Sequence, residues 1–357
     1  MSGRAKRILY TVLDCILWMG AIVGVALVLL YAVPSENGRP ALADRIACYA
    51  IACCVLLRVP VLLHELGHLL FGLFVGMKPV AFTVSLFRIA GGRIKFIGYS
   101  QTAGATEAVP KNGKHVRAKF IVFALGGGVL DLLFGGVMLA LFLCLPYHAG
   151  LLFCGLLALF FLAEGIRSFL PAQLPAGKTD GALVLGVLKR APEEEVLLRV
   201  LTAQGILYRG HFSELSQALL FEAPVVREDC PQYHALLELQ YCYLLSTGEK
   251  VRAESALNRL ESLSEYFSEE QSRVLKCELA YCACALDEEP NAAKAQGLLE
   301  EGEKGCAAYY RAAAAIAALQ GEQTADLLAA AEKAQKKEPL AGVRALEKTL
   351  LSGIKKA

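Results

Sequence analysis

Apolar residues are concentrated in the first half of the chain, in runs long enough to cross a lipid bilayer. These runs extend over residues 8–33, 46–77, 120–145 and about 150–163. A hydrocarbon core of about 30 Å is crossed by roughly 20 helical residues. The pattern therefore predicts an all-α membrane domain with four spanning segments, in contact with the lipid bilayer.

Two interpretations fit the first apolar run, a cleaved signal peptide or a retained membrane segment. A signal peptide has a shorter apolar core, followed by a cleavage site of small residues. The run over residues 8–33 is long enough to cross the bilayer with some tilt. Its length favours a retained first span.

The pattern changes between the second and third apolar runs. Residues 82–88 and 93–98 are short and β-prone, and Gly91-Gly92 separates them, which predicts a small β-hairpin. Residues 78–119 contain eight basic residues and a single acidic one. The positive-inside rule places that segment in the cytoplasm. The N-terminus and the second half of the chain then lie on the same side.

The second half of the chain has a different pattern of hydrophobic and polar positions. From Pro192 onward, amphipathic stretches of helical length alternate with short turns, which recur at Gly248, Glu288 and Gly321. The pattern resembles a tetratricopeptide-like stack of helical hairpins, without a clean consensus. We expect residues 1–190 to form the membrane domain and residues 191–357 a soluble helical-repeat domain. Its architecture suggests a groove for a cytoplasmic peptide or protein regulator.

Composition and charge agree with this division. Hydrophobic residues make up 55% of the chain, charged residues 20%, and the mean hydropathy is +0.46. These values argue against an ordinary soluble enzyme, a disordered chain and a secreted disulfide scaffold. Residues 1–190 hold 18 basic and 8 acidic residues, which leaves 18 of the 36 basic and 26 of the 34 acidic residues for the second half. Because the basic half is the apolar one, its cations belong at a bilayer surface and nucleic acid is not an expected partner.

The 12 cysteines are divided evenly between the two halves, with no CxxC pair. Several lie in apolar or helical runs. The sequence therefore predicts that the cysteines serve as small buried hydrophobic residues in a reducing or lipid environment. With the charge pattern, this indicates a multi-pass protein of the cell membrane whose N-terminus and C-terminal domain are cytoplasmic.

The second apolar run contains the motif His64-Glu65-Leu66-Gly67-His68. Histidines four residues apart on a helix project from one face and can bind one zinc ion, and Glu65 is placed to act as a general base. The alternative is a pair of hydrogen-bonded histidines and a salt-bridged glutamate on a solvated helix. The neighbouring residues are almost all apolar, and ionisable groups in such a segment are costly unless they have partners or a function. The motif therefore favours metal-dependent hydrolysis.

A catalytic zinc site needs a third protein ligand. Phe71 and Phe74 stand where the metzincin extension requires Gly and His, so that class is excluded. Asp180 follows a Pro- and Gly-containing break and precedes Gly181. From the residues alone, Asp180 is equally well a metal ligand or the N-cap of a cytoplasmic helix.

At this point the sequence resembles the site-2 protease family of intramembrane zinc metallopeptidases, over roughly residues 44–190. The resemblance is carried by the HExxH motif in one span and by Asp180-Gly181 after a Pro-containing break. It implies one zinc ion per chain, with His64, His68 and Asp180 as ligands and Glu65 as the general base. It also implies that the hairpin over residues 82–98 is membrane-associated, and that an edge strand there could hold an extended substrate by strand addition. A membrane-embedded protein or peptide would be the substrate.

The resemblance also implies a substrate-binding element at Gly127, Gly128 and Asp131, which loosely fits a family motif of Gly-Pro followed by Asn. Gly128 replaces the Pro and Asp131 replaces the Asn. Ser168 stands where the family usually has Asn. Because an ionised Asp131 can only accept hydrogen bonds, these departures affect the expected positioning of substrate.

Three functions are therefore compared. The first is an intramembrane zinc metalloprotease that hydrolyses a peptide bond in or next to a transmembrane segment. The second is an inactive membrane scaffold or regulator acting through its C-terminal helical repeats. The third is a zinc-dependent membrane enzyme acting on a non-peptide bond. The intact ligands and base of the motif favour an enzyme over the scaffold.

Overall fold

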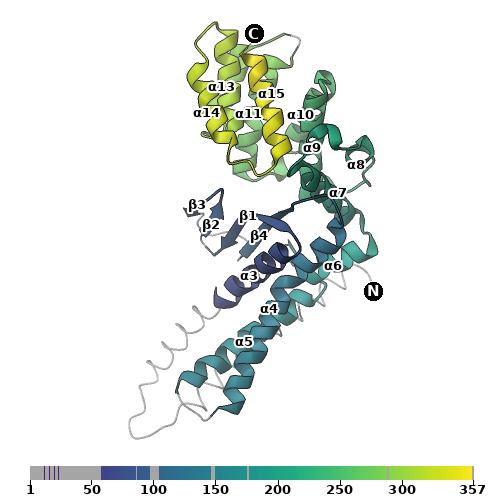
Figure 1. Cartoon of the computed structure of the whole chain (residues 1–357), viewed down its shortest axis with the longest axis vertical. Helices are drawn as coiled ribbons and strands as arrows, with labels where there is room; N and C mark the ends of the chain where they lie inside the picture. The colour runs from purple at the N-terminus through teal and green to yellow at the C-terminus, as the bar shows by residue number, and fades with distance from the viewer. Residues whose placement is uncertain are drawn as a thin grey trace. The chain divides into compact units, whose positions relative to one another are not determined.

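The computed structural model describes residues 58–85, 87–96, 104–145, 149–174, 177–287 and 289–355, together with positions 12, 16, 20 and 23. Most of the predicted first span, and the part of the second that precedes Arg58, lie outside the described residues. The described chain is mostly helical with a small antiparallel sheet (Figure 1), which confirms the fold class in outline.

The described residues divide into two compact units. The N-terminal unit contains the described residues up to Ala108 and the segment Arg117–Lys189. The C-terminal unit contains Val109–Val116 and the described residues from Arg190 onward. The loop before Arg117 therefore packs with a unit that is mostly formed by a later part of the chain.

Among the described residues, four helices form most of the N-terminal unit: α3 (Arg58–Phe74), α4 (Val116–Cys144), α5 (Ala149–Phe169) and α6 (Asp180–Lys189). The apolar runs 120–145 and 150–163 are thus confirmed as helices, and α5 extends beyond the expected end to Phe169. Within the described part of the chain, α4 is the one helix long and apolar enough to cross a membrane. The arrangement of four spanning segments stays a prediction.

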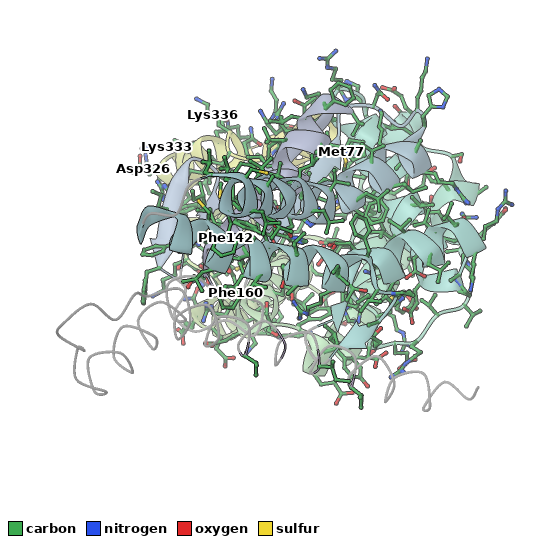
Figure 2. The ribbon with its side chains drawn as sticks, turned by 90° about the horizontal axis from the view of Figure 1, so that it is seen from below. Met77, Phe142, Phe160, Asp326, Lys333 and Lys336 are labelled. Atoms are coloured by element: carbon green, nitrogen blue, oxygen red, sulfur yellow. The ribbon has the colours of Figure 1, made fainter. Side chains whose placement is uncertain are left out.

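Glycines bring α4 and α5 close together along their length (Figure 1). A Cβ atom on Gly135 of α4 would lie 2.8 Å from the Leu162 side chain, and one on Gly155 of α5 would lie 2.9 Å from the Phe142 ring. Small residues at such contacts let helix backbones approach each other, as is common between helices in membranes. Phe160, which Figure 2 labels with Phe142, is fully buried in this unit.

The sheet contains four strands in the order β3-β2-β1-β4: β1 (Met77–Val84), β2 (Phe87–Ala90), β3 (Arg93–Phe96) and β4 (Gly104–Pro110). The turn at Gly91-Gly92 joins β2 and β3 as predicted, and both glycines have positive φ. The single strand expected over residues 82–88 is wrong, because the chain reverses after Ser85, whose φ is 54°. No Gly, Pro or Asn marks that reversal, and β4 was not predicted.

The C-terminal unit consists of helices. They are α7 (Pro192–Leu207), α8 (Gln217–Phe221), α9 (Pro231–Thr247), α10 (Lys250–Ser262), α11 (Glu269–Ala285), α12 (Ala292–Glu300), α13 (Ala307–Leu319), α14 (Ala325–Gln335) and α15 (Ala341–Ile354), with short 3-10 helices at Phe212–Glu214 and Ser264–Tyr266. The turns expected at Gly248 and Gly321 are confirmed, since both glycines are left-handed and follow the ends of α9 and α13. Successive helices from α9 to α14 pack against each other.

The loop between β4 and α4 packs on α7 within the C-terminal unit. A Cβ atom on Gly205 of α7 would lie 2.6 Å from the carbonyl oxygen of Asn112. A Cβ atom on Gly113 would lie 2.8 Å from the Ile206 side chain. Two glycines therefore permit this close contact of backbones.

The last helix, α15, contacts α7 and α9 as well as its neighbours α13 and α14. A buried charge network joins it to the stack: Arg311 of α13 pairs with Glu347 of α15 and Glu278 of α11. Tyr241 of α9 donates a hydrogen bond to Glu278 at 2.9 Å. The Arg311 side chain is only 4% exposed, so it neutralises two enclosed carboxylates from helices far apart in the sequence.

We expect Arg311→Met to lower the free energy of unfolding by about 3–5 kcal/mol, because it leaves buried carboxylates without their cation. The matched control is Lys333→Met on α14, whose side chain is exposed (Figure 2) and whose loss should change stability by no more than about 0.5 kcal/mol. Denaturant unfolding of the full chain, followed by far-ultraviolet circular dichroism, measures both. Equal stability of the two variants would contradict the role given to Arg311.

Candidate metal centre

The HExxH motif lies in the middle of α3, as the sequence predicts. His64 and His68 are one helical turn apart, and their Nε2 atoms are 3.1 Å apart. His68 is 5% exposed. The helix therefore presents two imidazole nitrogens to one small enclosed volume.

Asp180 completes this cluster from the first residue of α6. Its Oδ2 atom lies 3.2 Å from His64 Nε2, and its Oδ1 atom lies 3.6 Å from His68 Nε2. The N-cap of α6 is Thr179 and not Asp180, because Thr179 Oγ1 accepts a hydrogen bond from the backbone N–H of Ala182 at 3.3 Å. Because Thr179 supplies the cap, the Asp180 carboxylate is available to face the histidines.

These three residues lie close enough to share one metal ion. The two Nε2 atoms are 3.1 Å apart, and the two oxygens of Asp180 lie 3.2 Å from one of them and 3.6 Å from the other. One ligand atom from each residue lies within 4.8 Å of the other two. His64, His68 and Asp180 are thus a cluster that can hold a metal ion.

Hydrogen bonds at the far side of each ring fix which nitrogen faces the cluster. His64 Nδ1 lies 2.7 Å from Asp131 Oδ2, and His68 Nδ1 lies 2.8 Å from the carbonyl oxygen of Phe123. Both partners are acceptors, so each Nδ1 carries the proton and each Nε2 of a neutral imidazole presents a lone pair. Carboxylate and carbonyl partners of this kind are typical of metal-binding histidines.

The donor set itself indicates a cation. Two Nε2 lone pairs and the Asp180 carboxylate converge within 4.8 Å, and all three groups repel one another electrostatically. A shared proton or a metal ion would relieve that repulsion. Ser168 adds a further contact, since its Oγ atom donates a hydrogen bond to Asp180 Oδ2 at 2.8 Å and orients that carboxylate.

Glu65 lies beside the cluster and is 5% exposed. Thr106 of β4 donates a hydrogen bond from Oγ1 to Glu65 Oε2 at 2.6 Å. A Cβ atom on Gly104, also in β4, would lie 2.6 Å from Glu65 Oε1. Among the described residues β4 is an edge strand of the sheet, and its Gly104 and Thr106 lie next to the carboxylate of the motif.

The glycines before Asp131 make room for the imidazoles. A Cβ atom on Gly127 would lie 2.6 Å from His64 Cε1 and 2.7 Å from His68 Nε2. A Cβ atom on Gly67 of α3 would lie 2.4 Å from the carbonyl oxygen of Gly126. Any side chain at these positions would push α3 and α4 apart. The glycine run is therefore required by the packing of the site.

The structure brings together His64, Glu65, His68 and Asp180 as expected, and it brings Asp131 to His64. Asp131 is fully buried, and its Oδ1 atom has no hydrogen-bond partner among the described residues. Gly128 lies against Ser168, since a Cβ atom on Gly128 would lie 2.8 Å from Ser168 Oγ. Substrate contacts of Asp131, Gly127 and Gly128 stay a prediction.

Sequence reasoning missed two residues at this site. The contact of Thr106 with Glu65 joins residues that are 41 positions apart in the chain, and no local sequence pattern predicts it. Ser168 attracts notice in the sequence only as a departure from the family. Ser168 lies near the end of α5, 12 residues before Asp180. Its hydroxyl group donates a hydrogen bond to the Asp180 carboxylate.

Comparisons of the chain with protein-family models, curated proteins and solved structures give no match. The assignment of a function therefore depends on the geometry of this site and on the motif that forms it.

Gly127→Ala should weaken the binding of a metal ion at this cluster, because the added methyl group displaces both imidazoles. Gly136→Ala on the same helix is the matched control, since a Cβ atom there meets nothing within 4 Å among the described residues. We expect the first variant to bind zinc at least about tenfold more weakly than the second, a loss of the size seen when the surroundings of metal ligands change. Equilibrium dialysis with elemental analysis measures the affinity. Equal zinc binding by the two variants would contradict this account.

Proposed function

We propose that the chain is an intramembrane zinc metalloprotease, which hydrolyses a peptide bond in or next to a transmembrane segment of its substrate. The observation that carries the proposal is the convergence of His64, His68 and Asp180 with the buried Glu65 beside them. The resemblance to the site-2 protease family supports the same conclusion. So does the apolar character of α4, which packs against the site.

The proposed cofactor is one zinc ion per chain. Two imidazoles, one carboxylate and an open fourth position form the ligand set of catalytic zinc in hydrolases. When bound, zinc would polarise the scissile carbonyl group and lower the pKa of an attacking water. Asp131 and Phe123 would hold the two imidazoles in their ligating orientation, and Ser168 would hold the carboxylate of Asp180.

Glu65 is the proposed general base. Its carboxylate would take a proton from the attacking water and later return it to the leaving amine, so that it acts first as base and then as acid. The hydrogen bond from Thr106 leaves Oε1 as the oxygen free for that exchange. Thr106 would therefore orient the base without taking part in the proton transfer.

Among the described residues β4 is an edge strand, and it is the proposed docking edge for the substrate. A transmembrane helix hides its peptide bonds in its own hydrogen bonds, so cleavage requires an extended segment. Strand addition to β4 would supply backbone hydrogen bonds to such a segment. It would lie next to Glu65, because Thr106 and Gly104 are both in this strand. The expectation for the predicted hairpin is thereby moved to the edge strand that follows it.

In this proposal the protein is a multi-pass protein of the cell membrane, and the helical C-terminal unit lies in the cytoplasm. That unit would recruit a substrate or a regulatory peptide or protein. The strongly acidic balance of residues 191–357 suits a soluble environment.

Glu65→Gln should retain zinc and fold but lower the rate of peptide-bond cleavage by about 10²–10⁴-fold, the usual contribution of a general base. The measurement is single-turnover cleavage of a transmembrane peptide by purified protein in detergent, with fragments identified by mass spectrometry. Cleavage at the parent rate by this variant would overturn the protease mechanism. Hydrolysis of a non-peptide substrate, with every peptide left intact, would favour the non-peptide enzyme instead.

Asp180→Ala should reduce zinc from about one ion per chain to a small fraction, because two histidines alone form an incomplete site. The control is Asp326→Ala on α14, which removes an exposed carboxylate (Figure 2) and should leave the zinc content unchanged. Metal analysis of protein purified without chelators gives the ratio. A wild-type chain without zinc would support the scaffold function.

A further inference from the structure

Two cysteines from different helices meet in the core of the C-terminal unit. Cys277 lies in α11 and has no exposed surface. Cys306 is partly buried at the N-cap of α13 and packs against the same core. Their side chains interact at the contact between α11 and the turn before α13. The sequence gives no sign of this pair, since 28 residues separate the two positions.

Backbone contacts place the two thiols at the same meeting point of α11 and the turn before α13. Cys277 Sγ lies 3.4 Å from the carbonyl oxygen of Arg273, and the backbone N–H of Glu303 donates to the same oxygen at 3.1 Å. Cys306 Sγ lies 3.2 Å from the carbonyl oxygen of Glu303. A Cβ atom on Gly302 would lie 2.6 Å from Cys277 Sγ. The turn that carries Cys306 is therefore fastened directly over Cys277.

Cys306 has the environment of a reactive thiol. Its Sγ atom accepts a hydrogen bond from the backbone N–H of Tyr309 at 3.3 Å, at the positive end of α13. The neighbouring Cys277 thiol and this N–H hold the pKa of Cys306 below its usual value. In contrast, burial raises the pKa of Cys284 in the same core. Thiolate character at one position only is typical of a redox-sensitive cysteine.

We propose that Cys306 and Cys277 form a peroxide-sensitive thiol pair, in which oxidation joins α11 to α13 by a disulfide. In the first step the Cys306 thiolate attacks hydrogen peroxide. An S–O bond forms, the O–O bond breaks, and the hydroxide released takes up a proton to give water. Cys306 is oxidised to the sulfenic acid and the peroxide is reduced.

In the second step Cys277 loses its proton and its sulfur attacks the sulfur of Cys306. The S–S bond forms as the S–O bond breaks, and a second water leaves. Two thiols and one peroxide thus give one disulfide and two waters. Cys277 is buried against the turn that carries Cys306, which suits a resolving thiol. The disulfide requires the two sulfur atoms to approach to a bond of about 2.05 Å.

The test uses the full chain in detergent, fully reduced and then treated with hydrogen peroxide. Free thiols are blocked with N-ethylmaleimide after denaturation, and peptides are mapped without reduction. We expect a cross-linked peptide that contains residues 277 and 306, and a loss of two alkylated positions from the 12 cysteines. At neutral pH, Cys306 should also react with iodoacetamide about tenfold faster than Cys284.

Three variants distinguish the pair from buried thiols that merely pack. Cys306→Ser retains an N-cap residue and should form no sulfenic acid. Cys277→Ser should leave Cys306 as a sulfenic acid that dimedone captures, because the resolving thiol is absent. Cys284→Ser is the matched control and should form the 277–306 link normally. No link in the wild-type chain, or equal alkylation of Cys306 and Cys284, would overturn the proposal, whatever the result of the protease assays.

Discussion

The candidate site depends on one close approach, that of α3 to α4 at Gly67, Gly126 and Gly127. Helices with ordinary side chains at the contact have axes about 8–10 Å apart, and at that distance the imidazoles would not reach acceptors on α4. The glycines remove the obstacle and allow the backbone of α4 to lie against both rings. Asp131 and the Phe123 carbonyl group then lie behind the imidazoles, where they select the nitrogens that face the cluster. One packing contact therefore determines ligand orientation as well as helix separation.

Buried ionisable groups of the site have hydrogen-bond partners on other elements of the fold. In an apolar unit, each buried ionisable group is unfavourable unless it has a partner. Glu65 has Thr106 and Asp180 has Ser168, and each partner comes from a different element from the one it serves. The site is therefore assembled by tertiary packing of α3, α4, α5, α6 and β4. It would not survive in a peptide of α3 alone.

The helices and the central motif could be predicted from the sequence because their signals are local. The spacing of His64 and His68 fixes their relation on any helix, and apolar runs mark α4 and α5. The contacts of Asp131 and Thr106 could not be predicted, because they join residues 67 and 41 positions apart and follow from helix packing. The reversal after Ser85 was not predicted, because Ser85 adopts a left-handed backbone conformation and serine, unlike glycine, does not indicate that conformation in a sequence.

The strand that carries Thr106 is shared between two folding units. Its residues from Gly104 to Ala108 belong to the N-terminal unit, whereas Val109 and Pro110 belong to the C-terminal unit. Hydrogen exchange of amide groups at the two ends of this short strand should therefore report the local opening of two different units.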